Sequence, residues 1–401
     1  MTPTTVETPT GAAQTMVLNM GPQHPSTHGV LRVILELNGE IVVKAEPIIG
    51  YLHTGIEKSC EAKTYSQVIT LTDRIDYLAP LSNNLGYCLA VEKLLGLEAP
   101  KRAQYIRVLL TELTRIASHL VWVGTHAIDL GAMSVFLYTF REREEIMKIF
   151  EYVSGQRMMT SYFRVGGLAL EPPPGFLDKV RRVIDALPGH IDEYEDLLTN
   201  NRIWLGRTKG VGIISADDAI AMGCSGPMLR GSGVAYDVRK AFPYSSYEDF
   251  RFEVQTQTAG DCFARYQVRV AEIRESIKIV RQAMEKIPKM DGPIRTEAPG
   301  IIPPSREEMK TSIEGLIYHF KIYTEGFAPP PGEVYQVIES PRGELGFFVA
   351  SDGSAKPYRV KVRAPSFVNL QSLPKLAVGR LIADVVACIG TTDIVLGEVD
   401  R

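Results

Sequence analysis

Two long segments carry apolar residues at the spacing of an α-helix, and they limit the possible folds of this chain more than any other feature. Residues 101–123 form a continuous apolar stripe that stops before Gly124. Residues 261–287 repeat the pattern, with Asp261 placed as an N-cap and Pro288 as a helix stop. A helix with one apolar face must bury that face against a neighbour. The two stripes therefore predict a central helical bundle.

Shorter helices and two groups of strands are predicted around this bundle. The dipeptide Asn38-Gly39 lies between two apolar runs in residues 15–50, which is a strong hairpin signal. Residues 333–363 alternate with period two and contain two turns, which predicts a β-meander. The predicted fold is α+β, with a central helical bundle, an N-terminal β-hairpin or sheet region and a C-terminal β-meander. The shorter predicted helices span 84–95, 137–154, 176–198 and 306–323, the last with Ser305 and Glu308 as a capping-box pair.

The chain divides into four predicted parts. Residues 1–14 are rich in threonine without an apolar run, which is typical of a disordered tail. An N-terminal α+β region is expected over 15–70 and the helical bundle core over 71–296. Residues 297–401 are expected to form a C-terminal α+β region that contains the meander and ends in a buried C-terminus.

Composition excludes several classes of function. The net charge is −3 with both signs mixed, which argues against nucleic acid as a main partner. Five scattered cysteines without a C-x-x-C pair fit a reducing compartment better than a disulfide framework. The most apolar stretch, 116–140, is interrupted by polar residues, whereas a membrane span needs about 20 apolar residues. Any membrane role is therefore expected to be peripheral.

A loop near the N-terminus concentrates polar residues. His24 and His28 lie four residues apart, a spacing that would place both rings on one face of a helix. Pro25 between them disfavours a helix at this point. One interpretation is a tight loop whose histidines bond backbone groups. The other is a shaped loop that holds a ligand, as loops of this composition often do.

Several ionisable positions elsewhere have both a structural and a functional interpretation. Tyr77 is either a core tyrosine or a reactive phenol. Asp73, Arg74 and Asp76 beside it suit an ion-pair network better than catalysis. Asp129 follows an apolar helix, where a carboxylate is costly to bury without a partner. Glu57 is either a solvated residue at a helix start or a proton relay.

The last nine residues resemble the D-P-C-x-x-C-x-x-H end of nickel–iron hydrogenase large subunits. Val395 and Glu398 stand at the cysteine positions, and Arg401 stands at the histidine position. The upstream segment R-I-D-Y-L-A resembles R-I-C-G-x-C, with Asp76 and Ala79 at its cysteine positions. Nickel needs soft thiolate ligands. A working hydrogenase is therefore not expected.

Longer blocks resemble the D-subunit family of respiratory complex I, the proton-pumping NADH–quinone oxidoreductases. The resemblance covers roughly residues 16–401, and several blocks are eight or more residues long. It implies a hydrogenase large-subunit-like fold. The blocks are 21–32, 51–58, 236–240, 318–321, 342–346, 363–371 and 397–401.

The resemblance implies roles for individual residues. In the family, the positions of His28 and Tyr77 bind the quinone headgroup, and the acid at the Asp129 position pairs with that histidine. The Arg74 position, with Asp76 beside it, lies close to the terminal iron–sulfur cluster of a neighbouring subunit. Several relatives carry a histidine near that cluster where this chain has Met159. A pH-dependent cluster potential that rests on this histidine is therefore in doubt here.

The resemblance also implies a setting for this chain. It binds no cofactor or metal itself: the substrate is a quinone, and the 4Fe-4S cluster belongs to the B subunit, which we call the cluster subunit. The C and I subunits and the membrane-bound H subunit are the other expected partners, on the cytoplasmic side of a bacterial inner membrane. Two alternatives remain open: a non-catalytic scaffold in the same complex, or the equivalent subunit of a relative fed by a deazaflavin coenzyme or ferredoxin.

Overall fold

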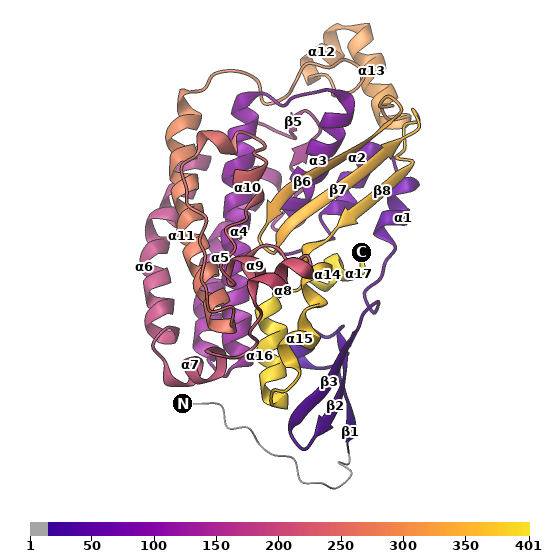
Figure 1. Cartoon of the computed structure of the whole chain (residues 1–401). Coiled ribbons are helices and arrows are strands. Elements are labelled where there is room, and N and C mark those ends of the chain that lie inside the picture. Colours follow the sequence, from indigo (N-terminus) through magenta and orange to yellow (C-terminus); the bar gives the residue numbers. More distant parts are fainter. Residues whose placement is uncertain (1–14) are drawn as a thin grey trace.

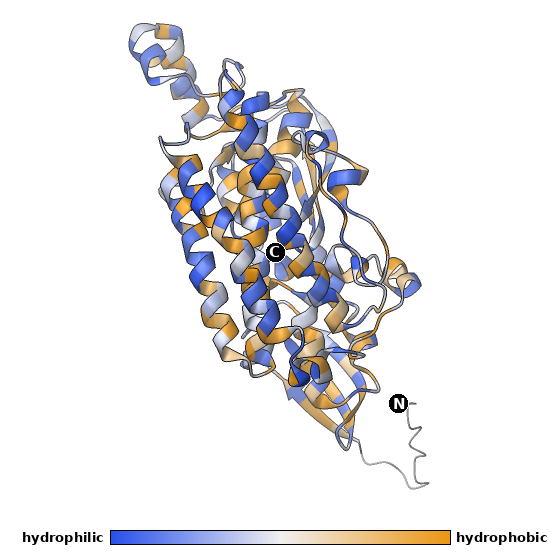
Figure 2. Cartoon of the chain, turned by 90° about the vertical axis from the view of Figure 1, so that its left-hand side faces the viewer, coloured by the Kyte–Doolittle hydropathy of each residue, from blue (hydrophilic) through white to orange (hydrophobic). Residues whose placement is uncertain are grey.

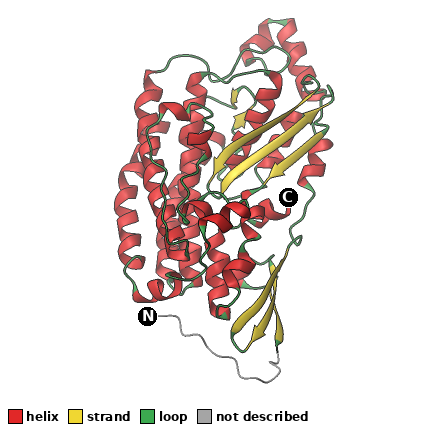
Figure 3. Cartoon of the chain, in the orientation of Figure 1, coloured by secondary structure: helices red, strands yellow, loops and turns green. Residues whose placement is uncertain are grey.

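The computed structural model describes residues 15–401, in which a body of long helices carries two separate three-stranded sheets (Figure 1, Figure 3). The predicted tail, 1–14, lies outside the described residues. The α+β class and the central bundle predicted from the apolar stripes are confirmed. The long helices that lie side by side are α4 (Lys101–Asp129), α5 (Met133–Ser154), α6 (Phe176–Leu198) and α11 (Cys262–Lys286).

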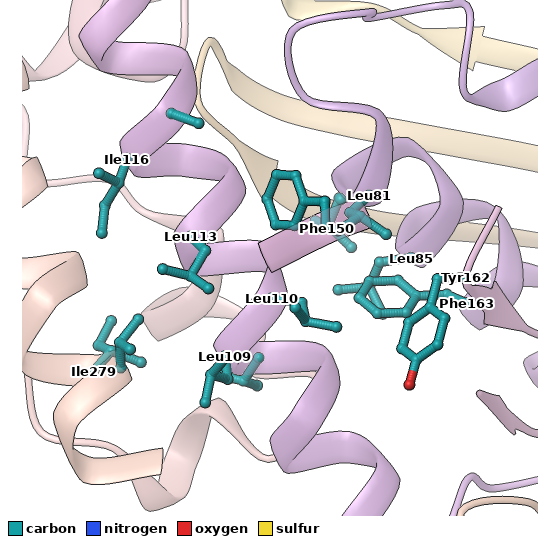
Figure 4. Close-up of a cluster of buried hydrophobic side chains, with 14 of the residues drawn as sticks. Leu81, Leu85, Leu109, Leu110, Leu113, Ile116, Phe150, Tyr162, Phe163 and Ile279 are labelled. Atoms are coloured by element: carbon teal, nitrogen blue, oxygen red, sulfur yellow. The ribbon is translucent and has the colours of Figure 1, made fainter. Parts of the chain in front are cut away.

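Helix α4 is the axis of the bundle, and it is longer than predicted. It continues past Gly124 to Asp129, so the expected stop at the glycine is wrong. A β-carbon at Gly124 would lie 2.4 Å from the Thr139 hydroxyl oxygen of α5. The glycine therefore marks a close approach of two helices rather than a helix end. Figure 4 shows the core that this packing creates, in which Leu109, Leu110 and Leu113 of α4 lie among side chains of other elements.

The predicted helix 306–323 is two helices. Helix α12 (Arg306–Thr311) ends at Ser312, whose extended backbone starts α13 (Ile313–Thr324). The Ser312 hydroxyl accepts the N–H of Gly315 and so caps the second helix. Gly315 also lies against the backbone of Glu308, which folds the two helices onto each other. A serine that serves as an N-cap inside an apolar pattern explains why one continuous helix was wrong.

Both predicted sheet regions are confirmed. The N-terminal sheet has the order β1-β2-β3, and Gly39 takes the left-handed conformation that its hairpin turn requires. The C-terminal sheet is an antiparallel meander of the order β6-β7-β8. The strands are β1 (Met16–Met20), β2 (Arg32–Asn38), β3 (Ile41–Ile48), β6 (Gly332–Ser340), β7 (Gly343–Ser351) and β8 (Arg359–Arg363).

Shorter elements connect these parts. Helix α3 begins at Pro80, four residues before the predicted start, because proline suits the first turn of a helix. The remaining elements are α1 (Ile56–Glu61), α2 (Tyr65–Thr72), α3 (Pro80–Leu95), β4 (Phe163–Arg164), β5 (Gly167–Leu168), α7 (Arg202–Thr208), α8 (Ala216–Ala221), α9 (Pro227–Arg230), α10 (Val238–Ala241), α14 (Pro365–Leu370), α15 (Leu373–Ala377), α16 (Ile382–Thr392) and α17 (Leu396–Asp400).

Two hydrophobic clusters hold these elements together. The first joins the long helices to the inner face of the C-terminal meander. The second lies under the N-terminal sheet and includes α15, α16 and α17. Both clusters draw residues from more than one of the four predicted parts, whose boundaries stay a prediction. No helix within residues 15–401 is both long and apolar enough to cross a membrane.

Helices α4 and α16 approach each other closely at Gly390, and we expect Gly390→Ala to destabilise the chain by about 1–3 kcal/mol. A β-carbon there would lie 2.4 Å from Nδ1 of His126, a buried ring held against Trp122 and Trp204 that cannot swing away. Thermal unfolding of the purified chain measures the effect. The control is Gly189→Ala in α6, where nothing lies within 4 Å of the added methyl group, so a small gain in stability is expected. Equal behaviour of the two variants would contradict this account of the packing.

Candidate active site

A fully buried arginine joins three distant parts of the chain. Arg342 lies in the turn between β6 and β7, and its Nη1 donates to Oδ2 of Asp76 at 3.1 Å and to the Ser118 hydroxyl. Its Nη2 donates to Oδ1 of Asp393, the residue that ends α16, at 3.4 Å. A buried guanidinium is tolerated when carboxylates and hydroxyls accept hydrogen bonds from its N–H groups. We call Arg342, Asp76 and Asp393 the arginine cluster.

Tyr77 follows directly after one acid of this cluster. The Asp76 carboxylate accepts the backbone N–H groups of Leu78 and Ala79, which fixes the turn before α3. Gly397 of α17 packs on the same segment, where a β-carbon would lie 3.3 Å from the Tyr77 ring. Burial raises the pKa of the half-buried Tyr77, and the nearby Asp76 raises it further. Tyr77 therefore keeps its proton at neutral pH and can donate it.

His28 lies close enough to the cluster to be affected by the charges of Asp393 and Arg342. It ends the short turn Pro25–Thr27 in a left-handed conformation, with φ of 54°. Although part of the residue is exposed, burial of the ring lowers the pKa of His28, Asp393 opposes this effect, and Arg342 adds to it. His28 is therefore neutral near pH 7. In the same loop His24 accepts the N–H of Ser26, so the interpretation in which histidines bond backbone groups holds for His24.

Asp129 ends α4 near Gly390 of α16, where a β-carbon would lie 3.4 Å from its carboxylate. Burial raises the pKa of Asp129 to about 6. Among residues 15–401, no hydrogen bond or ion pair joins Asp129 to His28, and the charges that act on the imidazole are those of Asp393 and Arg342. The pairing of His28 with Asp129 therefore stays a prediction.

The raised pKa of Asp129 makes a pH-dependent stability effect of Asp129→Asn the expected result. The folded state disfavours the charged carboxylate, so the wild-type chain loses stability as pH rises from the ordinary carboxyl range through about 6. Asparagine cannot ionise, so the variant should gain stability relative to wild type at pH 8 and little at pH 4. Urea denaturation at both pH values measures the difference. The exposed Asp196 of α6, replaced by Asn, should show no such pH dependence.

Glu57, the predicted proton relay, is held by ion pairs of its own. Glu57 accepts the N–H of Val362 and pairs with Lys361 and Arg401 at 3.0 and 3.1 Å. Burial alone would raise the pKa of Glu57, but these bonds together lower it, so the residue is held charged. That state suits an ion pair better than a proton relay, and the relay stays a prediction.

The expected network among Asp73, Arg74 and Asp76 is not what the structure contains. Exposed Arg74 donates to the carbonyl of Thr70, and Asp73 accepts the Ser161 hydroxyl. Asp76 instead finds its cation far away along the chain, in the arginine cluster. The local sequence could not reveal that partner. Met159 is half-buried.

Sequence reasoning missed most of the cluster. Arg342 lay inside a block that carried the family resemblance, and Asp393 began the hydrogenase-like terminal pattern, but neither was singled out. Glu398 is fully buried and accepts the N–H of Ser366. Burial raises the pKa of Glu398 to about 7, and Asp76 raises it as well. The structure thus brings two positions of the hydrogenase-like patterns, Asp76 and Glu398, close enough for each charge to disfavour the other.

Comparisons with known proteins show the family of this chain. The family described as "Respiratory-chain NADH dehydrogenase, 49 Kd subunit" matches residues 129–401. A D-type subunit of the NADH-quinone oxidoreductase of Solibacter usitatus is 67% identical to this chain, over 96% of this chain and 94% of that protein. This chain belongs to the family. The corresponding subunit of Koribacter versatilis is 64% identical, over 98% of this chain and 97% of that protein. That of Geotalea uraniireducens is 60% identical, over 97% of this chain and 100% of that protein. The family predicted from the sequence blocks is confirmed, and with it an oxidoreductase subunit.

Proposed function

We propose that this chain is the peripheral-arm subunit of a proton-translocating NADH:quinone oxidoreductase and forms the quinone-reduction site together with the cluster subunit. The observation that carries the proposal is the arginine cluster, whose charge acts on both Tyr77 and His28. The relatives described above all bear the name NADH-quinone oxidoreductase, which favours NADH over other electron donors. The buried acids at former cysteine positions, Asp76 and Glu398, support descent from a hydrogenase-like ancestor.

The residues suit the chemistry. Reduction of a quinone to a quinol takes two electrons and two protons, and both carbonyl oxygens gain negative charge as electrons arrive. Preorganised donors aimed at those oxygens stabilise that charge. Protonated Tyr77 can donate its hydroxyl to one oxygen, and neutral His28 can donate an N–H to the other. The 4Fe-4S cluster of the cluster subunit would supply the electrons.

A change of charge at Tyr77 can also affect other parts of the protein through the arginine cluster. Transfer of the Tyr77 proton to the reduced quinone leaves a negative charge beside Arg342, which bonds to Asp76 and Asp393 on different elements, while neutral His28 donates only a hydrogen bond and the second proton of the quinol comes from water. Asp129, with its pKa of about 6, is poised to take a proton near neutral pH. We propose that rearrangement of His28 and Asp129 relays this change toward the membrane. The C, I and H subunits complete the proposed assembly, on the cytoplasmic side of a bacterial inner membrane.

Replacing His28 by Ala should lower kcat/KM for a short-chain quinone by roughly 10²-fold, because one preorganised donor is lost. NADH–quinone turnover of the assembled complex measures the effect. His24→Ala is the matched control in the same loop, and it should retain most of the activity because His24 bonds its own backbone. Full activity of the His28 variant with normal assembly would remove the imidazole from the mechanism.

The rival scaffold function makes a different prediction. If this chain only held the cluster subunit, a photoreactive quinone analogue would label other subunits alone. Our proposal expects labelled peptides that contain Tyr77 or lie in the 21–32 loop. Mass spectrometry of the labelled complex, with excess unmodified quinone as competitor, decides between the two functions.

A further inference from the structure

Helix α13 presents its most apolar face to solvent. It projects with α12 from the top of the molecule in Figure 1 and in the turned view of Figure 2. Side chains that follow the helical spacing form one stripe, and each is between 51% and 72% exposed. A chain that worked alone would turn such a stripe inward, so an exposed one marks an interaction site. The stripe consists of Ile313, Leu316, Ile317, Phe320 and Tyr323.

Two hollows are lined in part by residues of this helix. One has a volume of about 250 Å³ and is lined mostly by apolar side chains, together with Tyr323 of α13, Arg164 and Arg295. The second has a volume of about 480 Å³ and lies between Tyr318 and the proline-rich connector 297–304. The stripe and the two hollows together form an uneven surface, which a partner of complementary shape can cover.

The first hollow carries unbalanced positive charge. The exposed Arg164 guanidinium makes no hydrogen bond or ion pair with any residue in 15–401. The Arg295 guanidinium is bonded to the carbonyls of Leu168 and Ala169, which leave its full charge in place. Two guanidinium groups at the wall of an apolar hollow fit a carboxylate.

Charge also decides which kind of occupant fits. The segment 306–325 contains three basic and four acidic residues. Helices that bind anionic lipid carry a surplus of lysine and arginine on their polar face, which this segment lacks. A second copy that paired through the same face would bring Arg164 and Arg295 toward like charges. A different protein with apolar side chains and an acid meets neither objection.

We propose that α13 and the arginine-lined hollow form a docking surface for a segment of another subunit of the complex. That segment lays apolar side chains along the stripe and places an Asp or Glu between Arg164 and Arg295. The inference rests on the multi-subunit assembly proposed above, but it does not depend on the quinone site.

Site-specific crosslinking in the assembled complex tests this proposal. A benzophenone amino acid replaces Phe320, and in a control it replaces the equally exposed Tyr358 of the meander region; the two residues are 64% and 68% exposed. We expect position 320 to crosslink to one apolar peptide of another subunit, and position 358 to give no adduct with that peptide. In a second sample, Arg164→Lys with a zero-length carbodiimide should join the new amine to an Asp or Glu of the same partner protein.

A charged substitution provides an independent readout. Phe320→Asp should lower the yield of that partner in affinity-purified complex at least about tenfold, because an aromatic anchor is lost. Tyr358→Asp should leave the yield unchanged, and the unfolding temperature of each isolated chain shows that both fold. Crosslinks from position 320 to a second copy, to lipid or to nothing would overturn the docking surface. Retained quinone turnover in that case would show that the proposed function still stands.

Discussion

Replacing Tyr77 by Phe should reduce NADH–quinone turnover by roughly 10²–10⁴-fold, the usual contribution of a positioned proton donor. Phenylalanine keeps the ring that packs against Gly397 and removes only the hydroxyl. Because burial and Asp76 raise the pKa of Tyr77, the hydroxyl is a stable donor in the resting state and a strong base once its proton has left. We expect kcat to fall more than KM rises, since the charge that this donor stabilises develops mainly in the transition state.

The matched control removes a hydroxyl elsewhere. Tyr87 is buried in the helical core and donates to the carbonyl of Tyr65 at 3.1 Å. Tyr87→Phe should cost some stability and leave kcat unchanged. Assays with a short-chain quinone, and with a ferricyanide acceptor that bypasses the quinone site, separate quinone reduction from electron input. Unchanged kcat and KM in the Tyr77 variant would end the proposed role of the phenol.

The second large effect concerns the arginine cluster. We expect Arg342→Met to destabilise the chain by about 3–5 kcal/mol, because it removes the counter-ion of buried Asp76 and leaves Asp393 only its longer ion pair with Arg269, at 3.6 Å. The loss should be greater at pH 8 than at pH 5. Burial already raises the pKa of Asp76 and Arg342 opposes this effect, so without the guanidinium the pKa rises further and protonation relieves the burial cost of Asp76 at low pH. Urea denaturation of the purified chain at the two pH values measures both parts of this prediction.

A surface pair serves as control for the arginine. Arg359 bonds Glu61 at 3.0 Å on the surface of the molecule, where solvent screens the pair. Arg359→Met should therefore change stability little at either pH. If Arg342→Met unfolded at the same urea concentration as wild type, the cluster would not be the structural centre of the site. The quinone hypothesis would then lose its main support.

The sequence predicted local features well and long-range ones poorly. The stripes of α4 and α11, the Asn38-Gly39 hairpin and the meander all follow from spacing within one segment. The errors at Gly124 and Ser312 arose because glycine and serine have more than one use. Gly124 lets two helices approach, and Ser312 caps a helix inside an apolar run.

The candidate site was predicted in part, through resemblance rather than through pattern. His28, Tyr77 and Asp129 were named because they match family positions. The charge of Arg342 acts on both His28 and Tyr77. Spacing could not reveal this arginine, because its carboxylate partners come from other parts of the chain. A buried charge is visible as such only when the fold shows what surrounds it.

The separation of these partners along the chain has a consequence for folding. Arg342 reaches across 266 residues to Asp76 and across 51 residues to Asp393. Contacts between such distant residues form late, because the loops between them must close first. The helices can therefore appear early while the reaction centre assembles near the end of folding. Refolding followed by helix content should outpace recovery of quinone-competent protein, and no single-part fragment should possess the centre at all.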